Sequence, residues 1–127
     1  MNIFNKAWTF GDPHFATLDG SQYTFNGLGD FVLLQNRSST VPAIEVQARC
    51  VRVNPTAGAT AFRAVAASEA NSGSIEFSVN QTTNNTINVL YNQQPLLISN
   101  SESMSMEKLI VSKINATYVL AQFASGE

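Results

Sequence analysis

Residues 8–34 read WTFGDPHFATLDGSQYTFNGLGDFVLL and contain the single tryptophan, the single histidine and all three aspartates of the chain. Four short apolar or aromatic runs, at residues 8–10, 15–18, 23–25 and 31–34, alternate with groups of Gly, Asp, Asn and Pro. Those residue types supply tight turns and positive φ angles. The stretch therefore predicts a meander of short antiparallel strands.

Two dipeptides in this stretch favour tight hairpin connections. In Asp19-Gly20 and Asn26-Gly27 both residues tolerate positive φ, so we expect a hairpin at each. Between them, Tyr23 and Phe25 alternate with Thr24. This alternation predicts that the two rings face the core and that the Thr24 hydroxyl faces solvent or a sheet edge.

Three motifs follow one another here at compatible spacing: Gly11-Asp12-Pro13-His14-Phe15, then Thr17-Leu18-Asp19-Gly20, then YTFNGLGDF at residues 23–31. Together they resemble the opening of a von Willebrand factor type D domain, in the cysteine-poor form of transmembrane mucins and sushi-domain membrane proteins. The resemblance implies an all-β, two-layer antiparallel β-sandwich at residues 8–127, preceded by a linker at residues 1–7. It also implies that residues 8–127 are a partial domain, without the C-terminal portion in which the family places a calcium loop.

Composition limits the classes of function. A chain of 127 residues with a net charge of −2 fits one domain with one core. Its basic residues are few and scattered, which argues against a nucleic-acid surface. No run of 18 apolar residues is present, and residues 1–6 lack the apolar region of a signal peptide. We therefore expect no membrane insertion by this segment.

The middle of the chain contains the clearest alternation. Ile44, Val46, Ala48 and Cys50 alternate with polar residues and predict a half-buried strand. Cys50 is the single cysteine, and we interpret it as a small buried apolar residue, with a disulfide partner elsewhere in the protein or a bridge to another chain as the alternatives. The family members that build covalent multimers use many cysteines, so this sequence departs from their pattern.

The remaining segments continue the strand pattern. Residues 61–70 suit a short helix or a strand, and we predict a strand because the surrounding segments are β. Residues 75–79 and 87–91 alternate and predict a hairpin. Further strand-like segments are expected at residues 96–98, 104–111 and 118–123.

The Asp12-Pro13 peptide bond is the most specific chemical feature. The Asp12 carboxyl can attack its own carbonyl carbon to form a five-membered anhydride, and the Pro13 nitrogen leaves once it is protonated. His14 adjoins the bond and is a candidate general acid. In several families with type D domains Gly-Asp-Pro-His is a self-cleavage site, and the resemblance implies this role for Asp12, Pro13 and His14. The alternative is a structural turn in which Asp12 caps backbone N–H groups and Pro13 fixes φ.

Metal sites are weaker hypotheses. A calcium site would draw on Asp12, Asp19 and Asp30, but their spacing matches no known calcium loop. One histidine and one cysteine cannot complete a structural zinc site, and a Ser-His-Asp triad would need partners that only tertiary structure supplies. We therefore expect no cofactor in this segment.

Four Asn-X-Ser/Thr sequons lie in predicted loops or turns, at Asn36, Asn80, Asn84 and Asn115. Such sequons accept N-linked glycans in secreted proteins, although they also occur as plain polar loop residues. Their placement favours an extracellular surface.

The resemblance implies a non-catalytic structural or adhesion module of a secreted protein or of the ectodomain of a single-pass membrane protein. Its expected partners are the remainder of its own domain and neighbouring extracellular domains. A calcium- or carbohydrate-binding β-sandwich is the alternative.

Overall fold

The computed structural model describes residues 8–10, 13–36 and 43–124. The predicted linker at residues 1–7 lies outside them. In order, the elements are β1 (Trp8–Phe10), β2 (His14–Ala16), β3 (Gln22–Thr24), β4 (Gly29–Gln35), β5 (Ile44–Arg52), β6 (Thr60–Glu69), β7 (Ser74–Asn80), the 3-10 turn η1 (Gln81–Thr83), β8 (Thr86–Tyr91), β9 (Gln94–Pro95), β10 (Glu102–Met106), β11 (Leu109–Asn115) and β12 (Tyr118–Phe123). The predicted all-β fold is confirmed.

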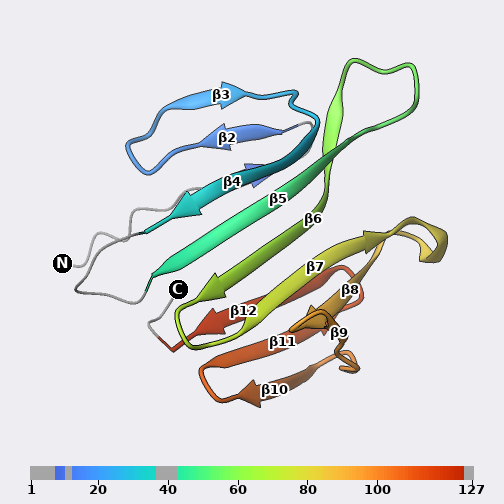
Figure 1. Cartoon of the computed structure of the whole chain (residues 1–127). Helices are drawn as coiled ribbons and strands as arrows, with labels where there is room; N and C mark the ends of the chain where they lie inside the picture. Colours follow the sequence, from blue (N-terminus) through green and yellow to red (C-terminus); the bar gives the residue numbers. More distant parts are fainter. Residues whose placement is uncertain (1–7, 11–12, 37–42, 125–127) are drawn as a thin grey trace. The chain divides into compact units, whose positions relative to one another are not determined.

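The strands form three sheets, ordered β1-β2-β3, β4-β5-β6-β7-β8-β9 and β10-β11-β12 (Figure 1). The chain divides into two compact units. One contains the described residues up to Phe31 together with Arg49–Arg63. The other contains Val32–Ala48 and the described residues from Ala64 onward.

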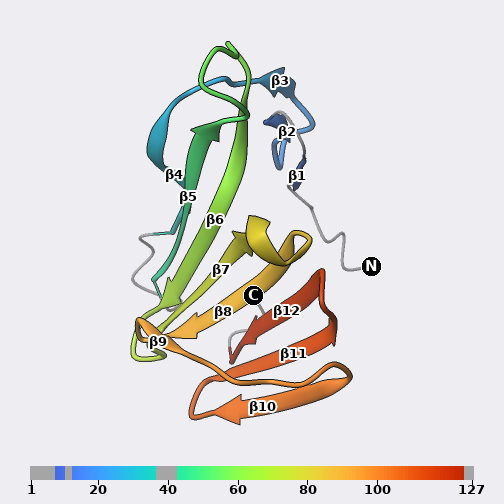
Figure 2. The same ribbon diagram turned by 90° about the vertical axis from the view of Figure 1, so that its right-hand side faces the viewer.

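The second unit is a two-layer antiparallel sandwich. Strands β7 and β8 form one layer and the β10-β11-β12 sheet the other (Figure 2). Alternation along β11 shows how the core is filled, because Leu109 and Val111 are buried while Ile110 between them is exposed. The core side chains that meet between the layers are Ile44, Ile75, Val89, Ile98, Leu109, Val111 and Phe123.

Several strand predictions are confirmed. Residues 61–70 form most of β6 and not a helix, since β6 pairs with β7 from Ala64 opposite Ser78 to Ser68 opposite Ser74. β7 and β8 form the expected hairpin, which η1 closes. Along β5, Ile44, Ala48 and Cys50 are buried as the alternation indicated.

The prediction of one strand over residues 104–111 is wrong. The segment is a hairpin in which β10 pairs with β11, with Met104 opposite Val111 and Met106 opposite Leu109. The apolar positions change from even to odd numbers across the polar pair Glu107-Lys108, as a tight turn requires. Residues 96–98 also lie outside the strands, since β9 ends at Pro95.

In the first unit, the hairpin at Asp19-Gly20 joins β2 to β3, and Gly20 has a φ of +87°. The hairpin predicted at Asn26-Gly27 does not form, because β3 and β4 belong to different sheets. A Cβ on Gly27 would lie 2.2 Å from ring atoms of Phe25. Gly27 therefore makes room for an aromatic ring and does not supply positive φ.

The expectation that Tyr23 and Phe25 are core residues is also wrong. Their exposed fractions are 50% and 37%. Each ring packs on another ring instead: Tyr23 stacks on Phe15 at 5.0 Å between centroids, and Phe25 meets Phe31 edge to face at 4.8 Å. A three-stranded sheet with strands of three residues is too small to cover both rings.

Candidate functional site

The first three strands position the proline side of the Asp12-Pro13 bond. Pro13 immediately precedes β2, and its side chain is fully buried. Its carbonyl oxygen accepts a hydrogen bond of 3.0 Å from the backbone amide of Phe25. Gly11 and Asp12 lie outside the described residues. The structure therefore describes the proline side of this bond, while the roles of Asp12 and Pro13 in self-cleavage stay predictions.

His14 is the first residue of β2 and lies opposite Phe10 of β1 and Thr24 of β3. Its Nδ1 atom is 2.8 Å from Oγ1 of Thr24. Thr24 is exposed, as its position in the alternation predicted. Sequence reasoning did not identify Thr24 as a partner of His14. Counting outward from a two-residue turn at Asp19-Gly20 would pair His14 with Phe25, whereas the observed register is centred on Asp19 and pairs His14 with Thr24.

β1 precedes the Asp12-Pro13 bond in the sequence. It pairs antiparallel with β2, with Trp8 opposite Ala16 and Thr9 opposite Phe15. β1 is an outer strand of its sheet and has β2 as its neighbour there. The Asp12-Pro13 bond thus belongs to the short connection between two strands that pair with each other.

The other two aspartates have separate local roles. Asp19 accepts hydrogen bonds from the hydroxyl of Thr17 and, at 3.4 Å, from the amide of Ser21, and these bonds lower its pKa. Asp30 accepts two hydrogen bonds from Arg49, which lower the pKa of Asp30. No group of three or more His, Cys, Asp or Glu side chains gathers as a metal site within the described ranges.

Cys50 is 2% exposed, and burial raises the pKa of its thiol, with a further contribution from the negative charge of Asp30. Because the thiolate is the reactive form of cysteine, this environment makes the side chain inert. The interpretation of Cys50 as a small buried residue is confirmed.

Asn80 is the last residue of β7, Asn115 is the last residue of β11, and Asn84 follows η1. Asn80 and Asn115 adopt the same local structure, in which Oδ1 accepts hydrogen bonds from the backbone amide and the hydroxyl of the threonine two residues later. Asn84 is exposed at the end of η1 with a φ of 62°. Asn36 is half-buried, and Ser38 of its sequon lies outside the described residues.

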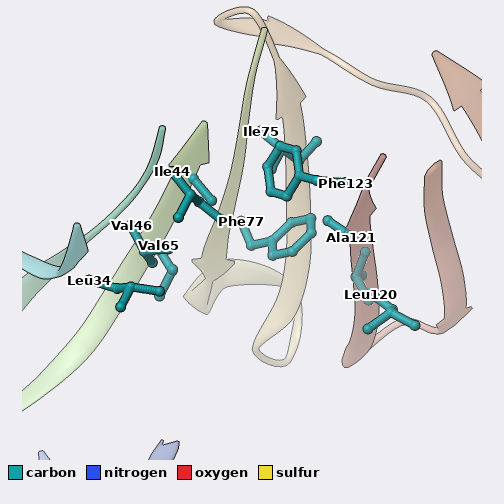
Figure 3. A pocket seen from close by; sticks show the side chains of 11 residues that line it. Leu34, Ile44, Val46, Val65, Ile75, Phe77, Leu120, Ala121 and Phe123 are labelled. Carbon is teal, nitrogen blue, oxygen red and sulfur yellow. The ribbon is translucent and has the colours of Figure 1, made fainter. Parts of the chain in front are cut away.

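The second unit contains an apolar cavity of about 310 Å³. Side chains from β4 to β7 and from β12 point into it, among them Ile44, Phe77 and Ala121 (Figure 3). All of its lining residues are apolar: Leu34, Ile44, Val46, Val65, Ala67, Ile75, Phe77, Val119, Leu120, Ala121 and Phe123. The cavity therefore offers none of the carboxylate, amide or hydroxyl side chains that calcium or sugar binding requires.

The part of the chain that the structure describes contains no helix of the length and apolar character that crossing a membrane requires.

Comparison with known proteins identifies the family. The family model described as von Willebrand factor type D domain matches residues 7–126. Human sushi domain-containing protein 2 is 35% identical over 124 residues, which cover 94% of this chain and 15% of the relative. Rat mucin-4 is 39% identical over 118 residues, which cover 90% of this chain and 5% of the relative. This chain thus spans a small part of the relatives that it matches, and it belongs to the von Willebrand factor type D domain family.

Proposed function

We propose that this domain is a non-catalytic structural module in the extracellular part of a larger protein, and that its chain cleaves itself between Asp12 and Pro13. The family match and the relatives' names, a mucin and a sushi domain-containing protein, support an extracellular module. Its partners would be the rest of its own domain and neighbouring domains of the same protein, as in an adhesion or assembly role.

The observation that carries the cleavage proposal is the anchoring of Pro13. Its ring is buried and its carbonyl oxygen accepts a hydrogen bond from the Phe25 amide, so the residue that carries the leaving nitrogen is held in place. Proline makes the bond a tertiary amide, and a positioned leaving group reduces the freedom that must be lost on reaching the transition state.

The reaction needs only the chain and water. A carboxylate oxygen of Asp12 bonds to the carbonyl carbon of the same residue, the bond from that carbon to the Pro13 nitrogen breaks, and the nitrogen takes up a proton. Water then opens the cyclic anhydride, which leaves a new carboxyl terminus at Asp12 and a new amino terminus at Pro13. His14 would supply the proton, because it adjoins the bond and a histidine ring can act as a general acid.

The pairing of β1 with β2 gives the cleavage a structural consequence. After the bond breaks, β1 stays on the N-terminal piece and β2 on the C-terminal piece. Three residue pairs then connect them: Trp8 with Ala16, Thr9 with Phe15 and Phe10 with His14. The pieces would stay associated in the native state and separate under conditions that disrupt the small sheet.

Variants of the full chain test the proposal. The chain would be held at about pH 5.5 and at about pH 7.5, on either side of the ordinary histidine titration, and its denatured mass and N-terminal sequence followed with time. We expect a Pro13 terminus that forms faster at the lower pH and is absent from D12N and P13A. H14Q should be slower by about 10²-fold or more. D19N is the matched control and should cleave like the natural sequence. An intact chain at both pH values would overturn the proposal.

A further inference from the structure

We propose that Thr24 is a positioning residue for His14 at the Asp12-Pro13 bond. The inference rests on the proposed cleavage and extends it to a residue on another strand. Thr24 lies on β3, ten positions after His14, and its Oγ1 atom is 2.8 Å from Nδ1 of the ring. Thr24 is remote in sequence from the bond that would break, and we assign its influence on the reaction to its contact with His14.

The register of the hairpin explains why the two side chains meet. The amide of Phe25 donates to the carbonyl oxygen of Pro13, so Pro13 and Phe25 occupy a hydrogen-bonded position of the antiparallel ladder. Proline has no N–H, so the second bond of that position is missing. The next pair, His14 with Thr24, is then of the non-hydrogen-bonded kind, in which side chains are closest.

The hydrogen bond assigns different roles to the two ring nitrogens. With Nδ1 engaged by Thr24, the ring is held in one orientation and Nε2 becomes the nitrogen through which it exchanges a proton. When the ring is protonated, Nδ1 donates to the Thr24 hydroxyl, and that bond survives the loss of the Nε2 proton. β1, β2 and β3 contain no Asp, Glu, Lys or Arg. Tyr23 is their one other titratable side chain, and it points to the opposite face of β3 from Thr24.

The two bonds from neighbouring residues of β3 fix both the peptide and the ring. Phe25 holds the Pro13 carbonyl through its backbone, and Thr24 holds His14 through its side chain. The backbone bond needs no particular side chain, whereas the ring contact needs a hydroxyl. A substitution of Thr24 should therefore disturb His14 and leave the position of Pro13 unchanged.

T24V removes the hydroxyl and keeps the shape and strand preference of the side chain, and T24S keeps the hydroxyl. We expect T24V to slow the appearance of the Pro13 terminus by about tenfold, part of the roughly 10²–10⁴-fold that a general acid supplies. T24S should keep the cleavage rate within about threefold of that of the natural chain, because it keeps the hydroxyl that contacts His14. Equal rates for T24V and the natural chain would overturn the inference.

A second measurement does not depend on cleavage. In a D12N background, the ¹⁵N chemical shifts of the His14 ring report which nitrogen carries the proton. We expect T24V to change them and T24S to restore them. If the natural chain never cleaves, the cleavage proposal fails, and the ring shifts still decide whether Thr24 orients His14. Ring shifts unaffected by T24V would contradict that orientation.

Discussion

Arg49 and Asp30 form a two-point ion pair between β5 and β4, with 2.8 Å from Nε to Oδ1 and 3.1 Å from Nη2 to Oδ2. The pair gives a physical role to the aspartate of the Gly29-Asp30-Phe31 motif. It connects two segments of the first unit that are far apart in sequence.

D30N tests this role through the pH and salt dependence of stability. Hydrogen bonds from Arg49 lower the pKa of Asp30 from its ordinary value of 3.8. A lowered pKa means that the stabilisation is complete above that ordinary value and is lost as the pH falls through the folded-state pKa. We expect D30N to melt at a lower temperature than the natural chain at neutral pH, and the difference to shrink in acid and in high salt.

D19N is the matched control for that measurement. The hydrogen bonds that lower the pKa of Asp19 come from the Thr17 hydroxyl and the Ser21 amide, which are uncharged. Its effect on melting should therefore not change with salt. A D30N difference that is equally insensitive to salt would show that the ion pair contributes nothing to stability.

A side chain at Gly27 should force the Phe25 ring to move, because a Cβ there would lie 2.2 Å from Phe25 and 2.7 Å from Phe31. We expect G27A to displace the Phe25 ring and to lower the free energy of unfolding by about 1–3 kcal/mol, the usual effect of overpacking. Urea denaturation measures the change. G58A is the control, since a Cβ at Gly58 has no atom within 4 Å, and it should be neutral. Equal effects of the two substitutions would contradict the packing of Phe25 over Gly27.

Cys50 should resist thiol reagents in the folded protein. Burial and the nearby charge of Asp30 raise the pKa of its thiol, so little reactive thiolate is present at neutral pH. We expect slow modification by iodoacetamide in buffer and fast modification in denaturant, measured by mass. Fast modification of the native chain would show that Cys50 is accessible.

Glycan attachment is testable by comparing turns of the same geometry. Asn54, Asn80 and Asn115 all accept bonds from a threonine two residues later, but Pro55 removes the first from the sequon pattern. When the chain passes through a secretory pathway, N80Q and N115Q should each remove one glycan mass, and N54Q should remove none. Unchanged masses for N80Q and N115Q would exclude glycans at those sites.

The elements that sequence predicted correctly are those fixed by local chemistry. Asp19-Gly20 forms its hairpin because Gly20 meets the backbone need for positive φ within the dipeptide itself. Asn26-Gly27 is a dipeptide of the same kind, but no hairpin forms there, and the ring of Phe25 occupies the space above Gly27. The packing of the Phe25 ring over Gly27 depends on tertiary structure, which the dipeptide alone does not specify.

The candidate site likewise combines residues that the sequence identifies with one residue that it does not. Asp12, Pro13 and His14 are readable from sequence because a nucleophile, a leaving group and a proton donor are adjacent. Thr24 enters through the β2–β3 register, ten residues away. The β2–β3 register is centred on Asp19 and differs from that of a two-residue Asp19-Gly20 turn, whereas the parity change between Met106 and Leu109 is register information that the sequence contains.

The most direct test of self-cleavage is the denatured mass of the full chain after incubation at about pH 5.5, where ordinary histidines are protonated. The proposal predicts two polypeptides whose masses sum to that of the chain plus one water, with the break between Asp12 and Pro13. A single polypeptide of unchanged mass would contradict it and would leave Gly-Asp-Pro-His as a structural turn between β1 and β2.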